Sequence, residues 1–160
     1  MTDRFEIKID DRLAQRWFGE LQARGTNLSG LMADIGELLL ESTQERFRTG
    51  ISPKGVKWAK IKHRSGSPLL DTGRMRDDIH PRSGSDFVEI RASAKQAKWH
   101  QFGTDPYIIR PKGKKALFWP GGPGPRTVVH HPGIVARPFM GLSRTDRRQI
   151  DDLAKRWLTT

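Results

Sequence analysis

The chain has 160 residues, no cysteine and a formal net charge of +11 at pH 7. This length suits one domain with one core, and the lack of cysteine excludes disulfides, thiolate metal sites and a cysteine nucleophile. No apolar run approaches the roughly 18 residues of a membrane span, and the first residues show no apolar signal core. We therefore expect a soluble protein that is made and assembled in the cytoplasm.

The positive charge is concentrated in the later two thirds of the chain. Residues 1–50 carry 7 basic and 9 acidic side chains, residues 51–100 carry 11 and 5, and residues 101–160 carry 11 and 4. This asymmetry predicts a face that meets an anionic partner. DNA, an acidic protein surface or simple solubility would each account for it.

The first third of the chain predicts a strand and two helices. Apolar and charged residues alternate over 4–10, which is typical of a half-buried strand. A short helix then ends at Gly25, and its apolar face is formed by Leu13, Trp17 and Leu21. A longer helix, capped by Asn27 or Ser29, ends at Gly50. Its apolar stripe consists of Leu28, Leu31, Met32, Ile35, Leu38, Leu39 and Phe47.

The middle of the chain predicts a basic loop followed by short elements. Residues 50–68 are rich in Gly, Pro, Ser and Lys and predict an extended loop. The segment 68–79 predicts one short helical turn. Residues 86–93 alternate in polarity and predict a strand that includes Phe87, and a further helical turn ends at Gly103.

Residues 105–135 predict a protruding β-hairpin flap that is rich in Pro and Gly. The stretches "YIIRP", "KKALFWP" and "RTVVHHP" predict three short strands, and prolines at their ends suit edge strands. The basic and aromatic side chains of the flap have three interpretations. They could stack on bases and bind phosphate, Leu117 and Trp119 could pack inward, or the flap could pack on a neighbouring subunit.

The end of the chain predicts an amphipathic helix. Ser143 is placed to cap it, and Asp146 lies in its first turn. Its apolar face is formed by Ile150, Leu153, Ala154, Trp157 and Leu158. The whole pattern predicts one α+β domain over 1–160. A small mixed or antiparallel sheet would be packed by a long helix in the N-terminal half and by the C-terminal helix, with the flap protruding.

The tripeptide Asp71-Thr72-Gly73 has the form of an aspartic-protease catalytic loop. Such a protease needs an almost entirely β scaffold and two carboxylates that share a proton. The predicted helices do not suit that scaffold, and Arg74 and Arg76 favour an ionised carboxylate at Asp71. We instead interpret Asp71 as the cap of a helical turn. The side chains expected to reach the core there are Leu69, Leu70 and Met75.

No other motif in the sequence predicts a catalytic, metal-binding or phosphate-binding site. The five histidines lack metal-ligand spacing, and His130 and His131 would point to opposite faces of a strand. We expect His100 to be a partly buried histidine with one hydrogen bond. There is no GxSxG elbow and no phosphate loop, although one sequence does not exclude a triad assembled across the fold. We predict no catalytic residue, metal or cofactor.

Four stretches, taken in order, resemble the phage virion morphogenesis (tail completion) family of tailed phages, including Mu-like members. They are "RFRTGISPKGVKW", "LLDTGRMRDDI", "WHQFGT" and "HHPGIVARPFMGLS". The flap also resembles the related tail-component family of siphophages. The resemblance runs from about Arg46 to Trp157.

This resemblance implies a non-enzymatic α+β subunit, a tail terminator or head–tail joining protein of the virion neck. The subunit would form a ring, expected to be a hexamer, at the head-proximal end of the tail. The ring would terminate the tail tube, join the tail to the head connector or stopper, and lie near the genomic DNA. The main alternative is a free-standing protein that binds DNA without sequence preference, and a hydrolase based on Asp71 is a third class.

The resemblance also implies residue roles. Structural roles fall to Gly50, Pro53, Gly55, Trp58, Asp71, Thr72, Gly73, Arg74, Phe102, Gly103, Ala136, Arg137, Pro138 and Phe139. The expected subunit or partner interface consists of Arg110, Lys112, Lys114, Lys115, Leu117, Trp119, Arg126 and Arg137. In addition, Arg137 could pair with an acidic neighbour, in this subunit or the next.

Overall fold

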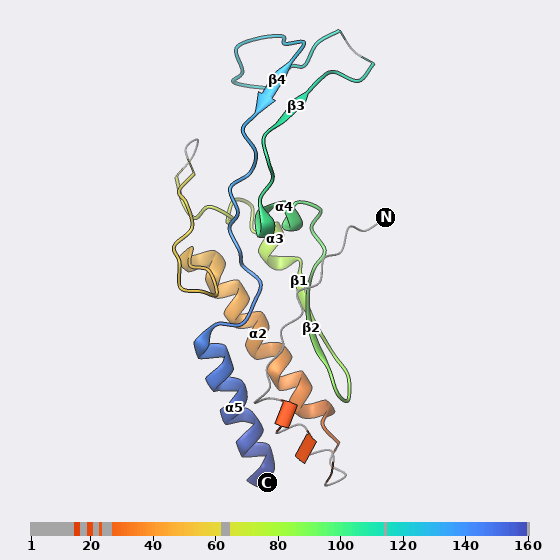
Figure 1. The fold of residues 1–160 in the computed structure, drawn as a ribbon, viewed down its shortest axis with the longest axis vertical. Helices are drawn as coiled ribbons and strands as arrows, with labels where there is room; N and C mark the ends of the chain where they lie inside the picture. The colour runs from red at the N-terminus through yellow and green to blue at the C-terminus, as the bar shows by residue number, and fades with distance from the viewer. Residues whose placement is uncertain are drawn as a thin grey trace.

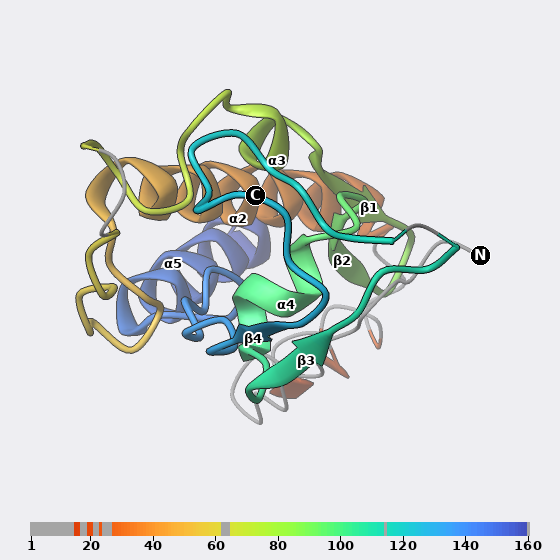
Figure 2. The same cartoon turned by 90° about the horizontal axis from the view of Figure 1, so that it is seen from above.

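The computed structural model describes residues 15–16, 19–20, 23, 27–61, 65–113 and 115–159. In chain order its elements are α2 (Ser29–Thr49), α3 (Arg74–Asp77), β1 (Ile79–Ser83), β2 (Val88–Ala92), α4 (Ala97–Phe102), β3 (Tyr107–Ile109), β4 (Val129–His131) and α5 (Arg144–Thr159). Helices α2 and α5 lie side by side in the body, the β1–β2 hairpin packs against α2, and the β3–β4 hairpin projects from one end (Figures 1 and 2). The fold is α+β, as the sequence predicts. The predicted strand over 4–10 and the helix face of Leu13, Trp17 and Leu21 lie outside the described residues.

Helix α2 is amphipathic, and its apolar stripe forms most of one core cluster. Leu28, Leu31, Met32 and Ile35 are buried together with Ile150 of α5, while Leu38 and Leu39 are partly buried against the same cluster. The backbone N–H of Ser29 donates to Asn27 Oδ1 over 3.0 Å, so Asn27 supplies an acceptor at the start of the helix. Gly50 ends the helix in the left-handed conformation, with φ of 69°. The predicted stripe and its end are confirmed.

A second core cluster forms around the ring of Phe47, at the other end of α2. The Phe47 ring meets Trp58 edge-on, with centroids 6.0 Å apart, and Phe139 at 5.1 Å. All three side chains are buried. The Trp58 indole N–H also donates to the carbonyl oxygen of Pro138 over 3.0 Å. These contacts join the end of α2, the basic loop and the segment that precedes α5.

The β1–β2 hairpin contains a strand that the sequence pattern does not predict. In its antiparallel register Ile79 lies opposite Ala92 and Ser83 opposite Val88. Pro81 pairs with Ile90 inside β1 and packs close to Gly36, where an added Cβ would lie 3.3 Å from the proline Cβ. The absence of a side chain at Gly36 therefore lets the hairpin approach α2 closely.

The turn around Asp71 differs from its predicted form. Helix α3 begins after Gly73, which is the N-cap residue with φ of 82° and has no side-chain cap hydrogen bond. The prediction placed the cap at Asp71, which is exposed, and it is wrong about which residue is the N-cap. In the first turn of the helix the N–H of Arg74 donates to the Thr72 hydroxyl over 3.5 Å. Leu69 and Met75 are buried in the core as expected, whereas Leu70 is only partly buried.

A buried ion pair joins the two long helices. Arg46 of α2 donates to Asp146 of α5 over 2.5 Å, and their side chains are 7% and 2% exposed. Ser42 completes the contact: its hydroxyl donates to Asp146 Oδ1 over 2.6 Å and accepts from Arg46 over 2.9 Å. The other terminal guanidinium nitrogen, Nη1, donates to the carbonyl oxygens of Phe139 and Gly141 over 2.8 and 2.9 Å. Every charge buried here thus has hydrogen-bonded partners.

Asp146 has a second role, at the start of α5. It accepts from the backbone N–H of Ser143 over 2.6 Å, while its own N–H donates to the Ser143 hydroxyl over 3.1 Å. This reciprocal arrangement is a capping box and confirms the predicted cap. Burial lowers the pKa of Arg46, and the charge of Asp146 opposes that shift. Arginine has so high an ordinary pKa that the guanidinium stays charged.

Replacing Arg46 with methionine tests this ion pair. The Arg46→Met variant keeps an unbranched side chain but leaves the Asp146 carboxylate buried without its cation. We expect the free energy of unfolding, measured by urea denaturation, to fall by about 3–5 kcal/mol. The matched control is Arg48→Met, which breaks the exposed Arg48–Glu45 pair on the same helix and should change stability little. Equal urea midpoints for the two variants would contradict the central role of the buried pair.

Candidate functional site

The root of the flap is the place where its two arms leave the body. A glycine on each arm lets the two backbones come close together there. Thr104 and Ile134 pair across the root: the Thr104 N–H donates to the Ile134 carbonyl over 2.9 Å, and the Ile134 N–H donates to the Thr104 hydroxyl over 2.9 Å. Gly103, with φ of 76°, and Gly133, with φ of 86°, flank this pair. A Cβ on Gly133 would lie 2.3 Å from the Thr104 carbonyl oxygen, so no side chain fits there.

Beyond the root, the two arms of the flap pair as a short antiparallel ladder. Tyr107 lies opposite His131, and their rings stack with centroids 4.7 Å apart. The ladder ends at Ile109 opposite Val129. The predicted first and third flap strands therefore exist. The predicted middle strand over "KKALFWP" is not found among residues 115–120, where only an isolated bridge between Leu117 and Arg126 forms.

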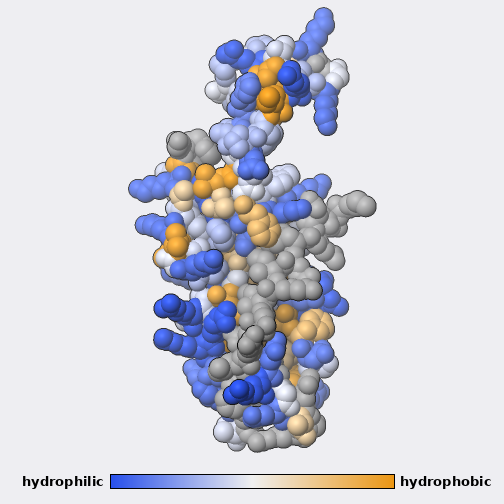
Figure 3. All heavy atoms as spheres, viewed as in Figure 1, coloured by the Kyte–Doolittle hydropathy of each residue, from blue (hydrophilic) through white to orange (hydrophobic). Residues whose placement is uncertain are grey.

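The flap exposes several large apolar side chains. The exposed fraction is 53% for Ile108 and 74% for Phe118, and Figure 3 shows apolar atoms on the flap surrounded by hydrophilic ones. Trp119 is 38% exposed although its ring folds over Gly122, where an added Cβ would lie 2.7 Å from the indole. Leu117 is partly buried. Inward packing, one of the three interpretations of the flap, is therefore met only in part, because Leu117 is partly buried and Trp119 stays exposed.

Cations surround these apolar groups. Arg110, Lys112, Lys115 and Arg126 are exposed, and none of them forms an ion pair within the part of the chain that the structure describes. Asp105 is the one carboxylate in the sequence of this segment. The structure thus brings six of the residues expected at an interface onto one projecting hairpin, whereas Lys114 lies outside the described residues. The six are Arg110, Lys112, Lys115, Leu117, Trp119 and Arg126.

Arg137, the remaining residue expected at the interface, lies in the body. It is buried, with 9% of its surface exposed, and its Nε donates to the carbonyl oxygen of Ala59 over 3.0 Å. A longer contact of 3.5 Å reaches the carbonyl of Val135. Burial lowers its pKa. Among the described residues its hydrogen-bond partners are backbone carbonyls, so the pairing with an acidic neighbour stays a prediction for the next subunit.

Gln101 holds the returning arm of the flap, and sequence reasoning missed it. Its side-chain oxygen accepts from the N–H groups of Phe139 and Met140 over 2.9 and 3.0 Å, and its side-chain nitrogen donates to the Met140 carbonyl over 3.1 Å. The extended segment belongs to no sheet, so the Gln101 side chain makes the backbone hydrogen bonds that a neighbouring strand would otherwise make. Residues 136–139, for which the resemblance implies a structural role, thus form an extended segment held by side chains.

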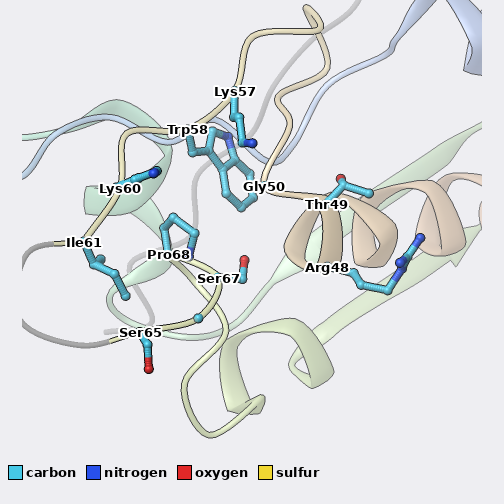
Figure 4. Close-up of a pocket in the computed structure, with 11 residues that line it drawn as sticks. Arg48, Thr49, Gly50, Lys57, Trp58, Lys60, Ile61, Ser65, Ser67 and Pro68 are labelled. Atoms are coloured by element: carbon cyan, nitrogen blue, oxygen red, sulfur yellow. The ribbon is translucent and has the colours of Figure 1, made fainter.

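The predicted basic loop forms a shallow pocket of about 390 Å³ beside the end of α2 (Figure 4). Its turn is built by Gly55, with φ of 79°, whose N–H donates to the Ser52 carbonyl over 2.8 Å. Pro53 lies close to Gly141, which ties the turn to the body. The cations that line the pocket are Arg48, Lys57 and Lys60. Among the described residues that line the pocket there is no carboxylate and no histidine.

His100 lies at the root of the flap in an unusual polar environment. The side chain is partly buried, and its Nδ1 has no hydrogen-bond partner in the described part of the chain. Its backbone carbonyl accepts from the Arg137 N–H over 2.7 Å. Burial, and to a lesser extent the charge of Arg137, lowers the pKa of His100. Partial burial is confirmed, and the expected hydrogen bond is not made at Nδ1.

No metal centre or membrane helix is found within the described ranges. There is no cluster of three or more His, Asp or Glu side chains suited to hold a metal ion among these residues. No helix in the same part of the chain has the length and apolar character needed to cross a bilayer. The features that remain are the basic pocket and the flap, and the flap carries exposed apolar side chains together with exposed cations.

A small α+β body that holds out an uncovered apolar and cationic hairpin is an arrangement typical of a protein that binds other macromolecules. Comparison with known families matches residues 9–159 to the phage virion morphogenesis family. The chain therefore belongs to this family, as its motifs suggest, and takes part in building a phage virion. No curated protein matches the chain, and no solved structure matches it.

An alanine at Gly133 tests the root of the flap. Its Cβ would overlap the Thr104 carbonyl, so we expect amide exchange at Thr104 and Ile134 to accelerate by roughly tenfold or more. The matched control is Gly113→Ala, which has a similar φ of 72° but nothing within 4 Å of the added Cβ. Exchange at the two root amides should stay as in the wild type in that control. Equal exchange in both variants would show that the root does not depend on Gly133.

The lowered pKa of His100 predicts a pH dependence of stability. The unfolded chain takes up a proton near pH 6.5, whereas the folded imidazole resists it, so the free energy of unfolding should fall as the pH drops below 6.5. In His100→Gln, urea denaturation at about pH 7.5 and about pH 5.5 should show a smaller fall than in the wild type. The control His130→Gln removes an exposed imidazole from the flap and should keep the wild-type pH dependence. An undiminished fall in His100→Gln would contradict the assignment.

Proposed function

We propose that this chain is the subunit of a ring at the head-proximal end of the phage tail. There it terminates the tail tube and joins the tail to the head connector. Family membership supports a role in virion assembly. The observation that carries the proposal further is the flap, a hairpin that projects from the body with uncovered apolar and cationic side chains (Figure 1).

A flap of this shape suits contact between neighbouring subunits. A hairpin that reaches away from one end of the body meets a different surface on the next copy, and such head-to-tail contacts close into a ring when the rotation between copies allows it. We propose six copies, with the tail tube and the connector or stopper as further partners in the virion neck. This role requires no catalytic group, metal or cofactor.

The alternative is a protein that binds DNA backbone without reading sequence. The net charge of +11 and the uncovered flap cations support it. It predicts that the monomer binds duplex DNA with an affinity that falls steeply as salt is added. In the ring, weaker contact with the passing genome would be compatible with the same charges.

Removing the flap tests the proposed function. Residues 110–128 can be replaced by Asn-Gly, because Ile109 and Val129 are paired and a two-residue turn connects such a pair directly. We expect the shortened protein to fold but to form no rings, as measured by solution mass and negative-stain images. In a phage that lacks the wild-type gene it should yield tails that are not joined to heads.

Two results would count against this function. One is a flapless protein that still supports the assembly of joined virions. The other is a wild-type protein that stays monomeric even with tail tubes and connectors present. If that monomer also binds DNA through the flap, with strong salt dependence, the alternative function is favoured.

A further inference from the structure

The outward face of α2 carries a row of carboxylates. Asp34, Glu37, Glu41 and Glu45 follow one another at helical spacing and are all exposed. At 1.5 Å per residue the row is about 16 Å long. Glu45 pairs with Arg48, whereas Glu37 and Glu41 form no ion pair with any described residue. In a chain of net charge +11 these four carboxylates form an acidic surface along one helix.

The flap has the opposite charge. Its exposed cations surround exposed apolar side chains, of which Ile108 and Phe118 are more than half exposed. In Figure 1 the flap projects beyond the C-terminal end of α2, so the tip of the flap and the acidic row of one copy lie at different levels of the molecule. Each chain therefore presents two complementary surfaces that point to different neighbours. This arrangement is what a head-to-tail contact between identical copies requires.

We propose that the flap of one copy docks on the acidic face of α2 in the next copy. The inference rests on the proposed ring and names the two surfaces that meet in it. Lys112 and Lys115 of the flap face Glu37 and Glu41 of the neighbour. The apolar side chains of the flap then cover the aliphatic parts of that helix surface, and the surrounding ion pairs fix the register.

DNA is the other macromolecule that the flap cations could bind, and the apolar side chains argue against it. Phosphates are bound by the cations of Lys and Arg and by other hydrogen-bond donors, and exposed aliphatic groups such as Ile108 contribute nothing to that contact. The aromatic side chains could stack on bases, but only on single strands. A second copy of this chain uses the cations and the apolar groups together.

Charge reversal on each surface tests the contact. The flap variant is Lys112→Glu with Lys115→Glu, and the helix variant is Glu37→Lys with Glu41→Lys. Each variant alone places like charges opposite each other, so we expect roughly a tenfold or greater loss of self-association, measured by solution mass against concentration. An equal mixture of the two should assemble again. In the mixture each reversed surface meets its complement, which gives alternating rings with an even number of copies.

Matched controls reverse the same number of charges elsewhere. They are Lys54→Glu with Lys95→Glu, and Asp86→Lys with Asp152→Lys, all at exposed positions outside the two surfaces. These controls should assemble as the wild type does. A helix variant that assembles normally would overturn the proposed contact and leave the ring in place. A flap variant that loses duplex DNA binding but keeps its self-association would assign the flap to DNA.

Because the sequence contains no cysteine, a weak contact can be tested by cross-linking two introduced cysteines. A chain with both Lys115→Cys and Glu41→Cys should form a ladder of covalent oligomers on mild oxidation, whereas either substitution alone can give dimers only. The control pair, Lys115→Cys with Asp152→Cys, should give no ladder beyond dimers. A ladder from the first pair supports the contact. Rings without that ladder would overturn it, and the lack of any oligomer in any of these experiments would also remove the proposed function.

Discussion

The buried pair of Arg46 and Asp146 is the interaction on which the rest of the structure depends. It lies where α2, α5 and the segment 139–141 meet, and it binds all three through one guanidinium. Burying two charges is costly unless each has good partners, and any shift of one helix along the other would leave a charge without them. The pair therefore fixes the register of the two helices and the position of the returning flap arm at once.

The direction in which the flap projects depends on this arrangement. Its returning arm runs as an extended segment that no strand pairs with, and three side chains hold the backbone in place of a sheet: Trp58, Gln101 and Arg46. At the root, Gly133 brings the two arms into contact. A surface held in one direction before binding loses less conformational freedom when a partner arrives. The paired root thus holds the uncovered outer part of the flap in position relative to the body.

Local patterns in the sequence predicted those parts of the fold that depend on near neighbours. The stripe of α2 follows from its periodicity, and the cap of α5 follows from Ser143 and Asp146, three residues apart. Strand β1 was missed because Pro81 lowers strand propensity, which its place against Gly36 overrides. The middle flap strand was predicted from composition but finds no partner in register beyond Leu117. The roles of Arg46 and Gln101 depend on residues about 100 and 40 positions away in the chain, which no local pattern reveals.

The charges suggest one partner when they are read along the sequence and another when their positions in the structure are known. A basic later part of the chain suggests an anionic partner, and DNA is the first candidate for a protein of net charge +11. The first third has a small net charge, yet α2 gathers its carboxylates on one outward face while Arg46 of the same helix is buried. The anionic partner that we propose for the flap is therefore a surface of the chain itself. A ring built from this contact would bury its most attractive charges between subunits, and the remaining cations of the loop around Lys57 and Lys60 would face the other partners of the neck.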